Sequence, residues 1–393
     1  MNPHGGCGTI DLGYVLPIRR HGDGDLAELT AYLRWLGEVV DVVVVDGSEP
    51  ELFEEAHHLW DGLVRHIPPD PRHRCLNGKV WGVRTGMEVI CRERVVIADD
   101  DVRYDMAGLV AMADALGRAD LVRPQNYFEP LPWHAAWDTA RILLNRSVGA
   151  DSPGTLGLRR SVFRTTGGYD GDVLYENLEL IRTVECAGGA VAHRPDLYVR
   201  RAPPTFRRFL EQRPRQAYDD LAQPAKLALL LAVLPTTLVA LRGPRRRLLL
   251  AVAGLIAGSM GLAERGRRRA GGTAVFPLPT VWWAPVWVVE RSLTVWWAIW
   301  ARLVRGGVRY GGSRLVVAAN SRRRLRVSLR VGGTSPNMAP VAEGSGAGPS
   351  APAEGDHRSS DLDALRLLVL EHDRSPHQQG PLPVGTDHHG GAS

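Results

Sequence analysis

Three consecutive carboxylates, Asp99, Asp100 and Asp101, follow the apolar residues 95–97. β-Branched, apolar residues of this kind predict a buried strand. Carboxylates at the end of such a strand repel one another, and a divalent cation relieves that repulsion. Mg²⁺ and Mn²⁺ bind one or two carboxylates and commonly take substrate phosphates as further ligands. Because Asp99 and Asp101 are two residues apart, they point the same way on an extended chain, so we expect these two to hold a metal.

The alternative for this acidic triplet is a solvated turn, since short acidic loops often follow strands. A second strand favours the ligand site. The valine-rich residues 39–45 predict another buried strand, which ends at Asp46-Gly47-Ser48. Ligands of open α/β sheets bind at the carboxyl ends of the strands, and Asp46 and Asp99 both take that position. The two strands together predict a binding site at this edge.

Predicted strands and helices alternate along the first half of the chain. Apolar β-branched runs predict strands, and apolar residues at helical spacing predict helices. We expect strands at residues 14–18, 39–45 and 95–97 and from residue 121, and helices at residues 25–36, 51–63, 77–89 and 106–116. This alternation is typical of an α/β sandwich with a mostly parallel sheet.

The whole chain has 44% apolar residues and a net charge of +5. Its positive charge is concentrated in the second half. The basic clusters at residues 242–247, 265–269 and 322–326 flank apolar runs. This placement favours anionic lipid headgroups over nucleic acid as the partner, and only residues 322–326 keep a nucleic-acid alternative. We therefore expect a membrane partner and no nucleic acid.

Three apolar runs, residues 227–241, 248–263 and 270–289, precede a tryptophan-rich stretch. The first two are shorter than the roughly 20 residues that span a bilayer, and the third contains three prolines. Tryptophan at this density is typical of the membrane interface. The pattern predicts a short helical hairpin or helices in the membrane plane, and the alternative is a buried soluble core.

These features divide the chain into three parts. Residues 10–222 are the predicted catalytic domain, and residues 223–330 are the predicted membrane-associated helical region. Residues 331–393 are rich in Gly, Pro, Ser and Ala, which predicts a disordered tail. Four widely spaced cysteines predict free thiols in a reducing compartment, and we expect no secretory signal, because residues 1–13 lack a basic start and an apolar core. We expect a cell-membrane protein with a cytoplasmic catalytic domain.

The order of short motifs resembles a family of enzymes. The motifs are Asp46-Gly47-Ser48, Gly78-Lys79, the acidic triplet, GTLGLRR at 154–160, GGYD at 167–170, ENLEL at 176–180 and QRPR at 212–215. Together they resemble the family-2 glycosyltransferases with the GT-A fold, in their membrane-associated branch. The resemblance covers residues 10–220, and more loosely the aromatic region to about residue 315. It implies a nucleotide-sugar donor and a Mn²⁺ or Mg²⁺ cofactor.

The resemblance also implies roles for single residues. Asp99 and Asp101 match the D-x-D pair, with Asp101 as the direct metal ligand. Gln212 and Arg215 match the Q-x-x-R-W motif beside the donor diphosphate, although Gln216 replaces its tryptophan. The positions that match donor-binding residues are Asp46, Lys79, Asp99, Asp100, Gln212, Arg213 and Arg215.

The implied catalytic base departs from the family pattern. Glu176-Asn177 stands where the family has Glu-Asp, and an amide has no titratable group near neutral pH. Glu176 is then the first candidate base and Glu179 the second, because residues three apart share a helical face. The alternative is that Glu176 caps a helix and Glu179 is solvated.

The sequence therefore predicts a metal-dependent, inverting glycosyltransferase. It would move a sugar from a nucleotide-diphosphate donor to a lipid or lipid-linked acceptor at the cytosolic membrane face. Two alternatives stay open. One is a catalytically silent relative that binds nucleotide sugars or acts as a scaffold, which Asn177 favours. The other is a nucleotidyltransferase, against which the motifs at Glu176 and Gln212 argue.

Overall fold

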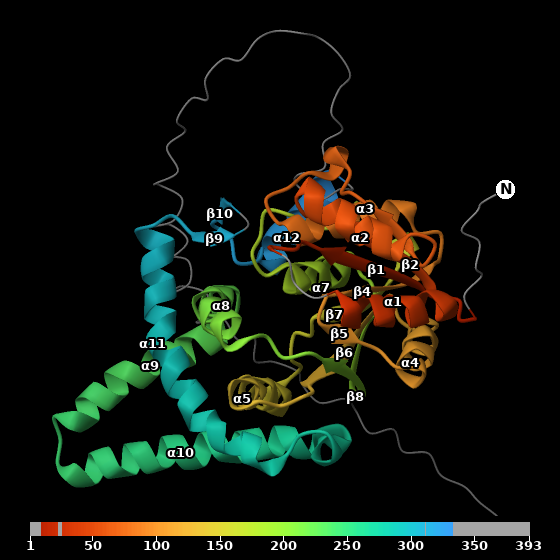
Figure 1. Cartoon of the computed structure of the whole chain (residues 1–393). Helices are drawn as coiled ribbons and strands as arrows, with labels where there is room; N and C mark the ends of the chain where they lie inside the picture. The colour runs from red at the N-terminus through yellow and green to blue at the C-terminus, as the bar shows by residue number, and fades with distance from the viewer. Residues whose placement is uncertain (1–8, 23–25, 311, 333–393) are drawn as a thin grey trace, which may run out of the picture. The chain divides into compact units, whose positions relative to one another are not determined.

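The computed structural model describes residues 9–22, 26–310 and 312–332 (Figure 1). The last described helix is α12 (Arg322–Gly332), so the predicted disordered tail lies outside the described residues from residue 333 onward.

A mixed eight-stranded sheet forms the centre of the fold. Its strand order is β3-β2-β1-β4-β7-β6-β8-β5. The pairings β1–β2, β1–β4, β2–β3 and β6–β8 are parallel, and β4–β7, β6–β7 and β5–β8 are antiparallel, so parallel pairings prevail as predicted. The strands are β1 (Gly13–Ile18), β2 (Asp41–Asp46), β3 (Arg65–Ile67), β4 (Arg94–Ala98), β5 (Val102–Arg103), β6 (Leu121–Phe128), β7 (Thr155–Arg159) and β8 (Val191–Arg201).

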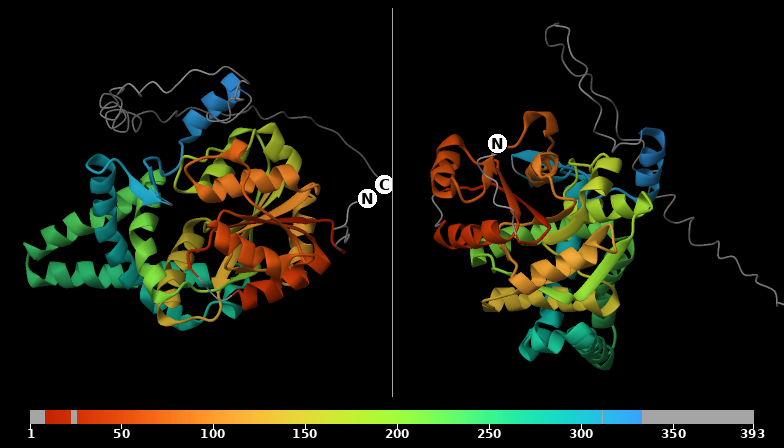
Figure 2. Two further views of the ribbon diagram at one scale, coloured as in Figure 1. Left: turned by 45° about the horizontal axis from the view of Figure 1, so that its top comes forward. Right: turned by 90° about the vertical axis from the view of Figure 1, so that its right-hand side faces the viewer.

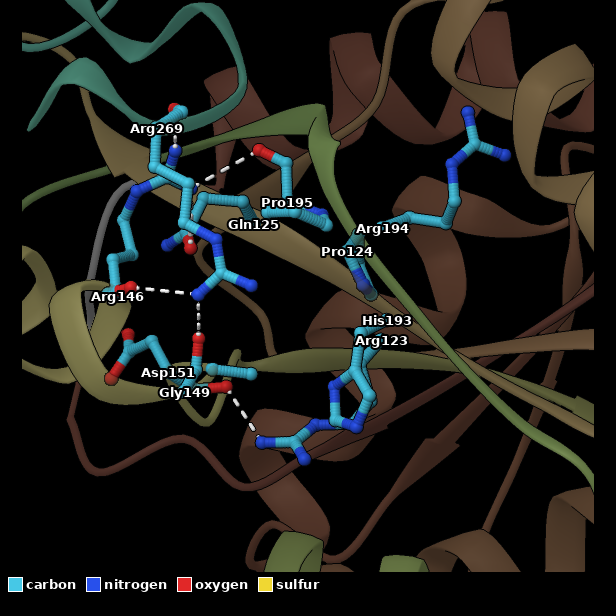
Figure 3. A pocket seen from close by; sticks show the side chains of 11 residues that line it. Arg123, Pro124, Gln125, Arg146, Gly149, Asp151, His193, Arg194, Pro195 and Arg269 are labelled. Atoms are coloured by element: carbon cyan, nitrogen blue, oxygen red, sulfur yellow. Dashed lines mark hydrogen bonds between the residues drawn. The ribbon is translucent and has the colours of Figure 1, made fainter. Parts of the chain in front are cut away.

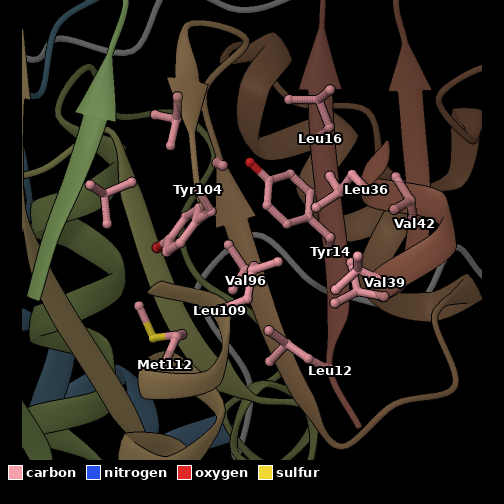
Figure 4. Packing of buried hydrophobic residues seen from close by; sticks show 14 of the residues in the cluster. Leu12, Tyr14, Leu16, Leu36, Val39, Val42, Val96, Tyr104, Leu109 and Met112 are labelled. Carbon is pink, nitrogen blue, oxygen red and sulfur yellow. The ribbon is translucent and has the colours of Figure 1, made fainter. Parts of the chain in front are cut away.

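Helices cover both faces of this sheet (Figure 2), because neighbouring residues of each central strand face opposite cores. Leu12, Tyr14 and Leu16 pack with α1 (Ala27–Val39) and α4 (Met106–Leu116), as Figure 4 shows. On the opposite face Val15, Val43 and Ile97 pack against α3 (Gly78–Val89) and α7 (Glu176–Cys186). The remaining helices of this part are α2 (Pro50–Trp60), α5 (Trp133–Val148) and α6 (Arg160–Thr165).

The predicted elements agree with the structure where the pattern is apolar and regular. Residues 106–116 form α4, and Asn77 caps α3 by accepting a hydrogen bond from the Lys79 backbone. The predicted strand at 39–45 begins later, at Asp41, because Val39 ends α1 and pairing with β1 begins at Asp41. The strands β3, β5, β7 and β8 were not predicted, since they are short or carry polar and basic residues.

A second group of helices follows the sheet. They are α8 (Phe206–Asp219), α9 (Pro224–Leu241), α10 (Arg245–Arg268) and α11 (Ala284–Leu303), and β9 (Val308–Tyr310) and β10 (Ser313–Leu315) come after them. The helices α9 and α10 form a hairpin, and α10 packs along α5 (Figure 1). Residues 224–241 and 245–274 are long and apolar enough to cross a membrane by length and composition, which is weak evidence for a span. The predicted runs were shorter because each helix extends through its polar ends.

Candidate active site

The acidic triplet ends β4, and two of its carboxylates converge on one arginine. Nε of Arg201 lies 2.8 Å from both oxygens of Asp101, and its Nη2 lies 3.2 Å from Oδ2 of Asp99. Asp100 does not share this partner, so the prediction that Asp99 and Asp101 point the same way agrees with the geometry. Burial together with the charges of Asp99 and Asp100 raises the pKa of Asp101 to about 6, although Arg201 acts in the opposite direction.

Arg201 reaches the triplet because β8 pairs with the segment that follows it. Val102 pairs with Arg201, and the backbone N–H of Ala202 donates to the carbonyl of Asp101 at 2.7 Å. The sequence analysis missed Arg201, because β8 reads VAHRPDLYVRR and lacks an apolar run. Its last residue nevertheless lies at the same sheet edge as the triplet.

Gly154 lets the chain pass close to the triplet. Its carbonyl accepts from the Asp99 backbone N–H at 2.8 Å, and its own N–H donates to Oδ1 of Asn126 at 2.7 Å. A Cβ atom here would lie 2.6 Å from Oδ2 of Asp99 and 3.0 Å from Nη1 of Arg201. The first glycine of the GTLGLRR motif is thus needed because any side chain there would collide with Asp99 and Arg201.

Lys79 joins the triplet to the start of α7. Its Nζ lies 2.5 Å from Oδ1 of Asp99 and 2.8 Å from Oε1 of Glu176, and it donates to Oδ1 of Asn177 at 3.2 Å. Burial acts to lower the pKa of Lys79, but the two carboxylates outweigh it and raise that pKa. The lysine therefore stays charged and holds the two acidic groups on either side of it.

Asn177 uses both ends of its amide. Oδ1 accepts from Lys79, while Nδ2 donates to the Pro153 carbonyl at 3.0 Å. An ionised aspartate has no donor and could not make the second bond. Asn177 consequently holds the loop before Gly154 in place. This positioning role differs from that of the catalytic base which the family has at this position.

A cavity of about 190 Å³ opens beside these residues. Predicted residues that line it are Asp101, Glu176, Asn177, Gln212 and Arg215. Asp138 lines it too, and further lining residues that the sequence analysis missed include Arg141, Arg201 and Asp219. Carboxylates and guanidinium groups therefore face one space, which is the arrangement that a phosphorylated substrate with a reacting hydroxyl requires.

Asp219, the last residue of α8, is the unusual carboxyl of this cavity. Its Oδ1 is buried and has no hydrogen-bond partner within the described part of the chain. Burial and the charges of Glu176 and Asp220 raise the pKa of Asp219 to about 8. The signal in the sequence is helical spacing, because Gln212, Gln216 and Asp219 follow one another at intervals of four and three residues. That spacing places all three on the cavity side of α8.

Two predicted residues lie in other surroundings. The Arg213 side chain is buried, donates to Oδ1 of Asp138 at 2.6 Å and lies over the Phe209 ring. Glu179 is fully buried, and its carboxylate accepts from the backbone and side-chain N–H groups of Asn320 at 2.7 and 2.8 Å. Neither residue lines the cavity, so the expected shared face of Glu179 and Glu176 is corrected: only Glu176 faces it.

Asp46 and Asp100 lie at the same sheet edge but outside this cavity. Asp46 pairs in register with Ile18 of β1, which separates it from β4. Its carboxylate is buried, accepts from the Ser48 backbone at 2.8 Å and lies 3.3 Å from Nε2 of His66. The Asp100 backbone carbonyl accepts from Arg103 at 2.7 Å.

The acidic pair fits a divalent cation. Asp99 and Asp101 direct oxygens at a single positive group, the Arg201 guanidinium, so the two carboxylates can converge on one cation. Two carboxylates plus diphosphate oxygens form a usual ligand set for Mg²⁺ or Mn²⁺. When bound, such an ion would neutralise a leaving diphosphate.

Among the comparisons with known proteins, only the search of solved structures finds proteins similar to this chain. A scan against protein-family models and a search of curated proteins find no match. The chain is similar to a mannosyltransferase from Pyrobaculum calidifontis in complex with GDP-Man and Mn²⁺, at 16% identity and a TM-score of 0.42, over 73% of this chain and 87% of that chain. It is also similar to mannosyl-3-phosphoglycerate synthase from Rubrobacter xylanophilus, at 15% identity and a TM-score of 0.35, over 52% of this chain and 70% of that chain.

A third similar structure is glucosyl-3-phosphoglycerate synthase from Mycobacterium tuberculosis in complex with Mn²⁺, UDP and glucosyl-3-phosphoglycerate. The identity is 13% and the TM-score 0.36, over 52% of this chain and 77% of that chain. At TM-scores this low, the similarity does not bear on activity.

Proposed function

We propose that this chain is a metal-dependent glycosyltransferase. It transfers a sugar from a nucleotide-diphosphate donor to a lipid or lipid-linked acceptor, with inversion at the anomeric carbon. The observation that carries the proposal is that Lys79 joins Asp99 of the acidic triplet to Glu176, which lines the same cavity as Asp101, Arg215 and Asp219. Such a cavity offers a place for a diphosphate and a proton acceptor for a hydroxyl.

The donor side is the end near β4. Asp99 and Asp101 would hold Mn²⁺ or Mg²⁺, whose charge would compensate the diphosphate. Arg215 stacks over the Tyr310 ring at 4.5 Å and lines the cavity, which places its charge where it would meet phosphate oxygens. Lys79 orients Asp99 through the contact at 2.5 Å.

The acceptor side needs a carboxylate that can take up a proton. Oε1 of Glu176 already accepts from Lys79, and Asp138 pairs with Arg213 and Arg141, which holds the pKa of Asp138 far below its ordinary value against the effect of burial. Oδ1 of Asp219 has no such partner among the described residues, which makes Asp219 the strongest base of this group.

In the proposed step the acceptor oxygen bonds to the anomeric carbon while the bond from that carbon to the diphosphate breaks. The electron pair leaves with the diphosphate, and the hydroxyl proton passes to the Asp219 carboxylate. Attack opposite the leaving group inverts the anomeric centre. A base with a pKa near the working pH suits this transfer.

We also propose a lipid acceptor and a place at the cytosolic membrane face, and the second group of helices supports the membrane part of this proposal. Many large apolar side chains of the hairpin are exposed, and α11 with the turn before it exposes tryptophans. These residues are Leu229, Leu238, Val239, Leu241, Leu249, Leu250, Val252, Ile256, Trp282, Trp296 and Trp300. Soluble surfaces rarely leave so large an apolar area uncovered, whereas a bilayer covers it.

The test is nucleoside-diphosphate release by the detergent-solubilised full chain, with Mn²⁺, a panel of nucleotide sugars and a lipid extract. We expect release with one donor class, and its loss on removal of Mn²⁺ and in Asp101→Ala. Asp100→Ala is the matched control, since its carboxylate lies outside the cavity. Release that is independent of metal and unchanged in Asp101→Ala overturns the proposal.

A catalytically silent relative is the second candidate. The observation that favours it is Arg201, which already pairs with both metal-binding carboxylates. This candidate predicts donor binding with no diphosphate release on any lipid extract, in the same assay.

A further inference from the structure

A second cavity, of about 220 Å³, lies away from the active site and is rich in positive charge (Figure 3). It is enclosed by the middle of β6, by β8, by the loop after α5 and by the turn η3 (Arg269–Ala274). Arg123, Arg146, Arg194, Arg269 and His193 line it, against the single carboxylate of Asp151. Lining groups of one sign are the usual mark of a site for the opposite charge.

Three of these guanidinium groups donate only to neutral oxygens. Arg123 donates to the Asp151 backbone carbonyl at 2.9 Å, and Arg269 donates to the Gly149 carbonyl at 2.6 Å. Arg146 donates to backbone carbonyls, to Oε1 of Gln125 and to the Tyr198 hydroxyl. Among the described residues, Arg123, Arg146 and Arg269 form no ion pair with a carboxylate.

The other two charged groups of the cavity wall do not change this balance. The carboxylate of Asp151 is already held by Arg141 at 2.7 Å and by Nδ2 of Asn145 at 2.8 Å. Arg194 forms its own ion pair with Asp196 at 2.7 Å. The cavity therefore keeps an excess of positive charge.

Burial makes that excess costly. The Arg146 side chain is only 1% exposed, and Nε of Arg123 is buried without a hydrogen-bond partner among the described residues. Burial lowers the pKa of both guanidinium groups. Burial and the charges of Arg123 and Arg269 also lower the pKa of His193, against the opposing charge of Glu185. Buried charges are normally paired, so a negative group is missing from this wall.

A purely structural explanation covers only part of the cluster. Arg146 donates to carbonyls at the end of α10, and Arg269 donates to carbonyls at the end of α5, so each caps the other's helix. Cations at helix C-termini are stabilising. This explanation leaves the buried Nε of Arg123 and the neighbouring His193 unexplained, and both lie together on the cavity wall (Figure 3).

We propose that this cavity is a binding site for a phosphoryl anion, separate from the donor site. The forked guanidinium groups of Arg123 and Arg269 suit phosphate oxygens. The volume of about 220 Å³ far exceeds the about 10–15 Å³ that one water requires, so a phosphoryl group with part of its ester fits. The anion is either a free phosphate compound or a lipid headgroup, since Arg269 directly follows the apolar helix α10.

The wall between the two cavities gives this site a route to the active site. Asp151 lines the anion cavity and pairs with Arg141, which lines the active-site cavity. The same loop continues to Pro153, whose carbonyl holds Asn177. An anion bound to Arg123, which donates to the backbone of Asp151, would therefore stabilise the loop that positions the acidic edge.

The first test titrates the detergent-solubilised full chain with inorganic phosphate and follows the imidazole of His193 by NMR. We expect saturable binding that raises the pKa of His193, because a bound anion outweighs the neighbouring arginines. Arg123→Gln and Arg269→Gln should each weaken phosphate binding by about tenfold or more, as for a lost charge-assisted hydrogen bond. Neither substitution changes a residue that lines the active-site cavity.

Arg159→Gln is the matched control, since Arg159 also donates to carbonyls at a helix end, those of Leu116 and Gly117, away from both cavities. It should lose some stability and keep wild-type phosphate binding. Circular dichroism of all three variants shows whether they fold. Equal phosphate affinity in folded Arg123→Gln, Arg269→Gln and wild type overturns the proposal, as does a His193 pKa that phosphate leaves unchanged.

The second arm separates the two sources of the anion. Flotation measures binding to phosphatidylcholine vesicles with or without phosphatidic acid. A headgroup ligand predicts that phosphatidic acid strengthens binding, that Arg123→Gln removes this gain, and that inorganic phosphate competes with it. A free phosphate compound predicts saturable phosphate binding that leaves vesicle binding unchanged. Both sources are rejected if the Arg123→Gln variant binds the vesicles like wild type and the wild-type chain binds no phosphate.

Discussion

Both carboxylate oxygens of Asp101 lie 2.8 Å from Nε of Arg201, at the edge where the proposed metal binds. The same guanidinium reaches Asp99 at 3.2 Å. One side chain thus neutralises the two carboxylates that the proposal assigns to Mn²⁺ or Mg²⁺. A divalent ion bound here would have to displace Arg201 from these oxygens.

Removing Arg201 should therefore strengthen metal binding in the absence of donor. We expect Arg201→Gln to bind Mn²⁺ about tenfold more tightly, which corresponds to about 1.4 kcal/mol. Titration followed by electron paramagnetic resonance of free Mn²⁺ measures this. Arg200→Gln is the control, because Arg200 pairs with Glu28 instead. Weaker Mn²⁺ binding in Arg201→Gln shows that the arginine does not compete with the metal.

The proposed base gives a prediction for activity. Asp219→Asn should lower nucleoside-diphosphate release by about 10²–10⁴-fold, the usual contribution of a general base, with donor affinity unchanged. Because the ionised carboxylate is the active form and its pKa is about 8, the wild-type rate should rise with pH through that value. The Asn variant should lose this rise. Glu176→Gln, which disturbs the Lys79 contact, should instead weaken donor binding. A full rise with pH in Asp219→Asn assigns the proton to another group.

The same carboxyl gives a prediction for stability. The pKa of Asp219 is raised in the folded protein above the roughly 3.9 of an unfolded chain. The free energy of unfolding therefore falls as pH rises from about 4 through about 8, and it falls no further above that range because of this group. Asp219→Asn should match wild type near pH 4 and be more stable by a few kcal/mol near pH 9. Urea unfolding at both pH values measures the difference, and a constant difference between them contradicts the raised pKa.

The sequence predicted the acidic edge because a buried apolar strand and the carboxyl-end rule act locally. The sequence motifs also predicted that Lys79 and Glu176 belong to one site. In the structure Nζ of Lys79 lies 2.8 Å from Oε1 of Glu176. Arg213 shows the limit of motif matching. Its neighbours Gln212 and Arg215 face the cavity, but the helical turn directs Arg213 into a buried ion pair with Asp138.

Arg201 and Asp219 could not be read from local pattern. Arg201 belongs to a strand whose polar sequence gives no strand signal, and its partners lie about a hundred residues earlier. The raised pKa of Asp219 depends on burial and on Glu176, which belongs to another helix. Long-range packing creates both properties, so they appear only in the folded chain.

Gly154 offers a test of the acidic edge through the backbone. Gly154→Ala places a methyl group 2.6 Å from Oδ2 of Asp99, so the carboxylate must move. We expect a loss of stability of about 1–3 kcal/mol, as for overpacking, together with weaker Mn²⁺ binding. Gly78→Ala is the control, since a methyl group there meets nothing within 4 Å. Unchanged Mn²⁺ affinity in Gly154→Ala removes Asp99 from the metal site.

The hairpin of α9 and α10 gives the prediction for the membrane. Leu238 is 45% exposed and Leu249 is 69% exposed, so a charge at either place should cost the folded protein little. In a bilayer each buried leucine contributes about 1.5–3 kcal/mol, so the double variant Leu238→Asp, Leu249→Asp should bind vesicles at least tenfold more weakly. Flotation with phosphatidylcholine vesicles measures this loss.

The control for that variant is Leu76→Asp, which adds a charge at a 43% exposed leucine just before α3. It should float like wild type. The hairpin variant should keep Mn²⁺-dependent donor binding, because neither leucine lines the active-site cavity, while transfer to a lipid acceptor falls with membrane binding. Flotation that equals wild type in the hairpin variant means that something other than a bilayer covers these helices, and the lipid acceptor then loses its structural support.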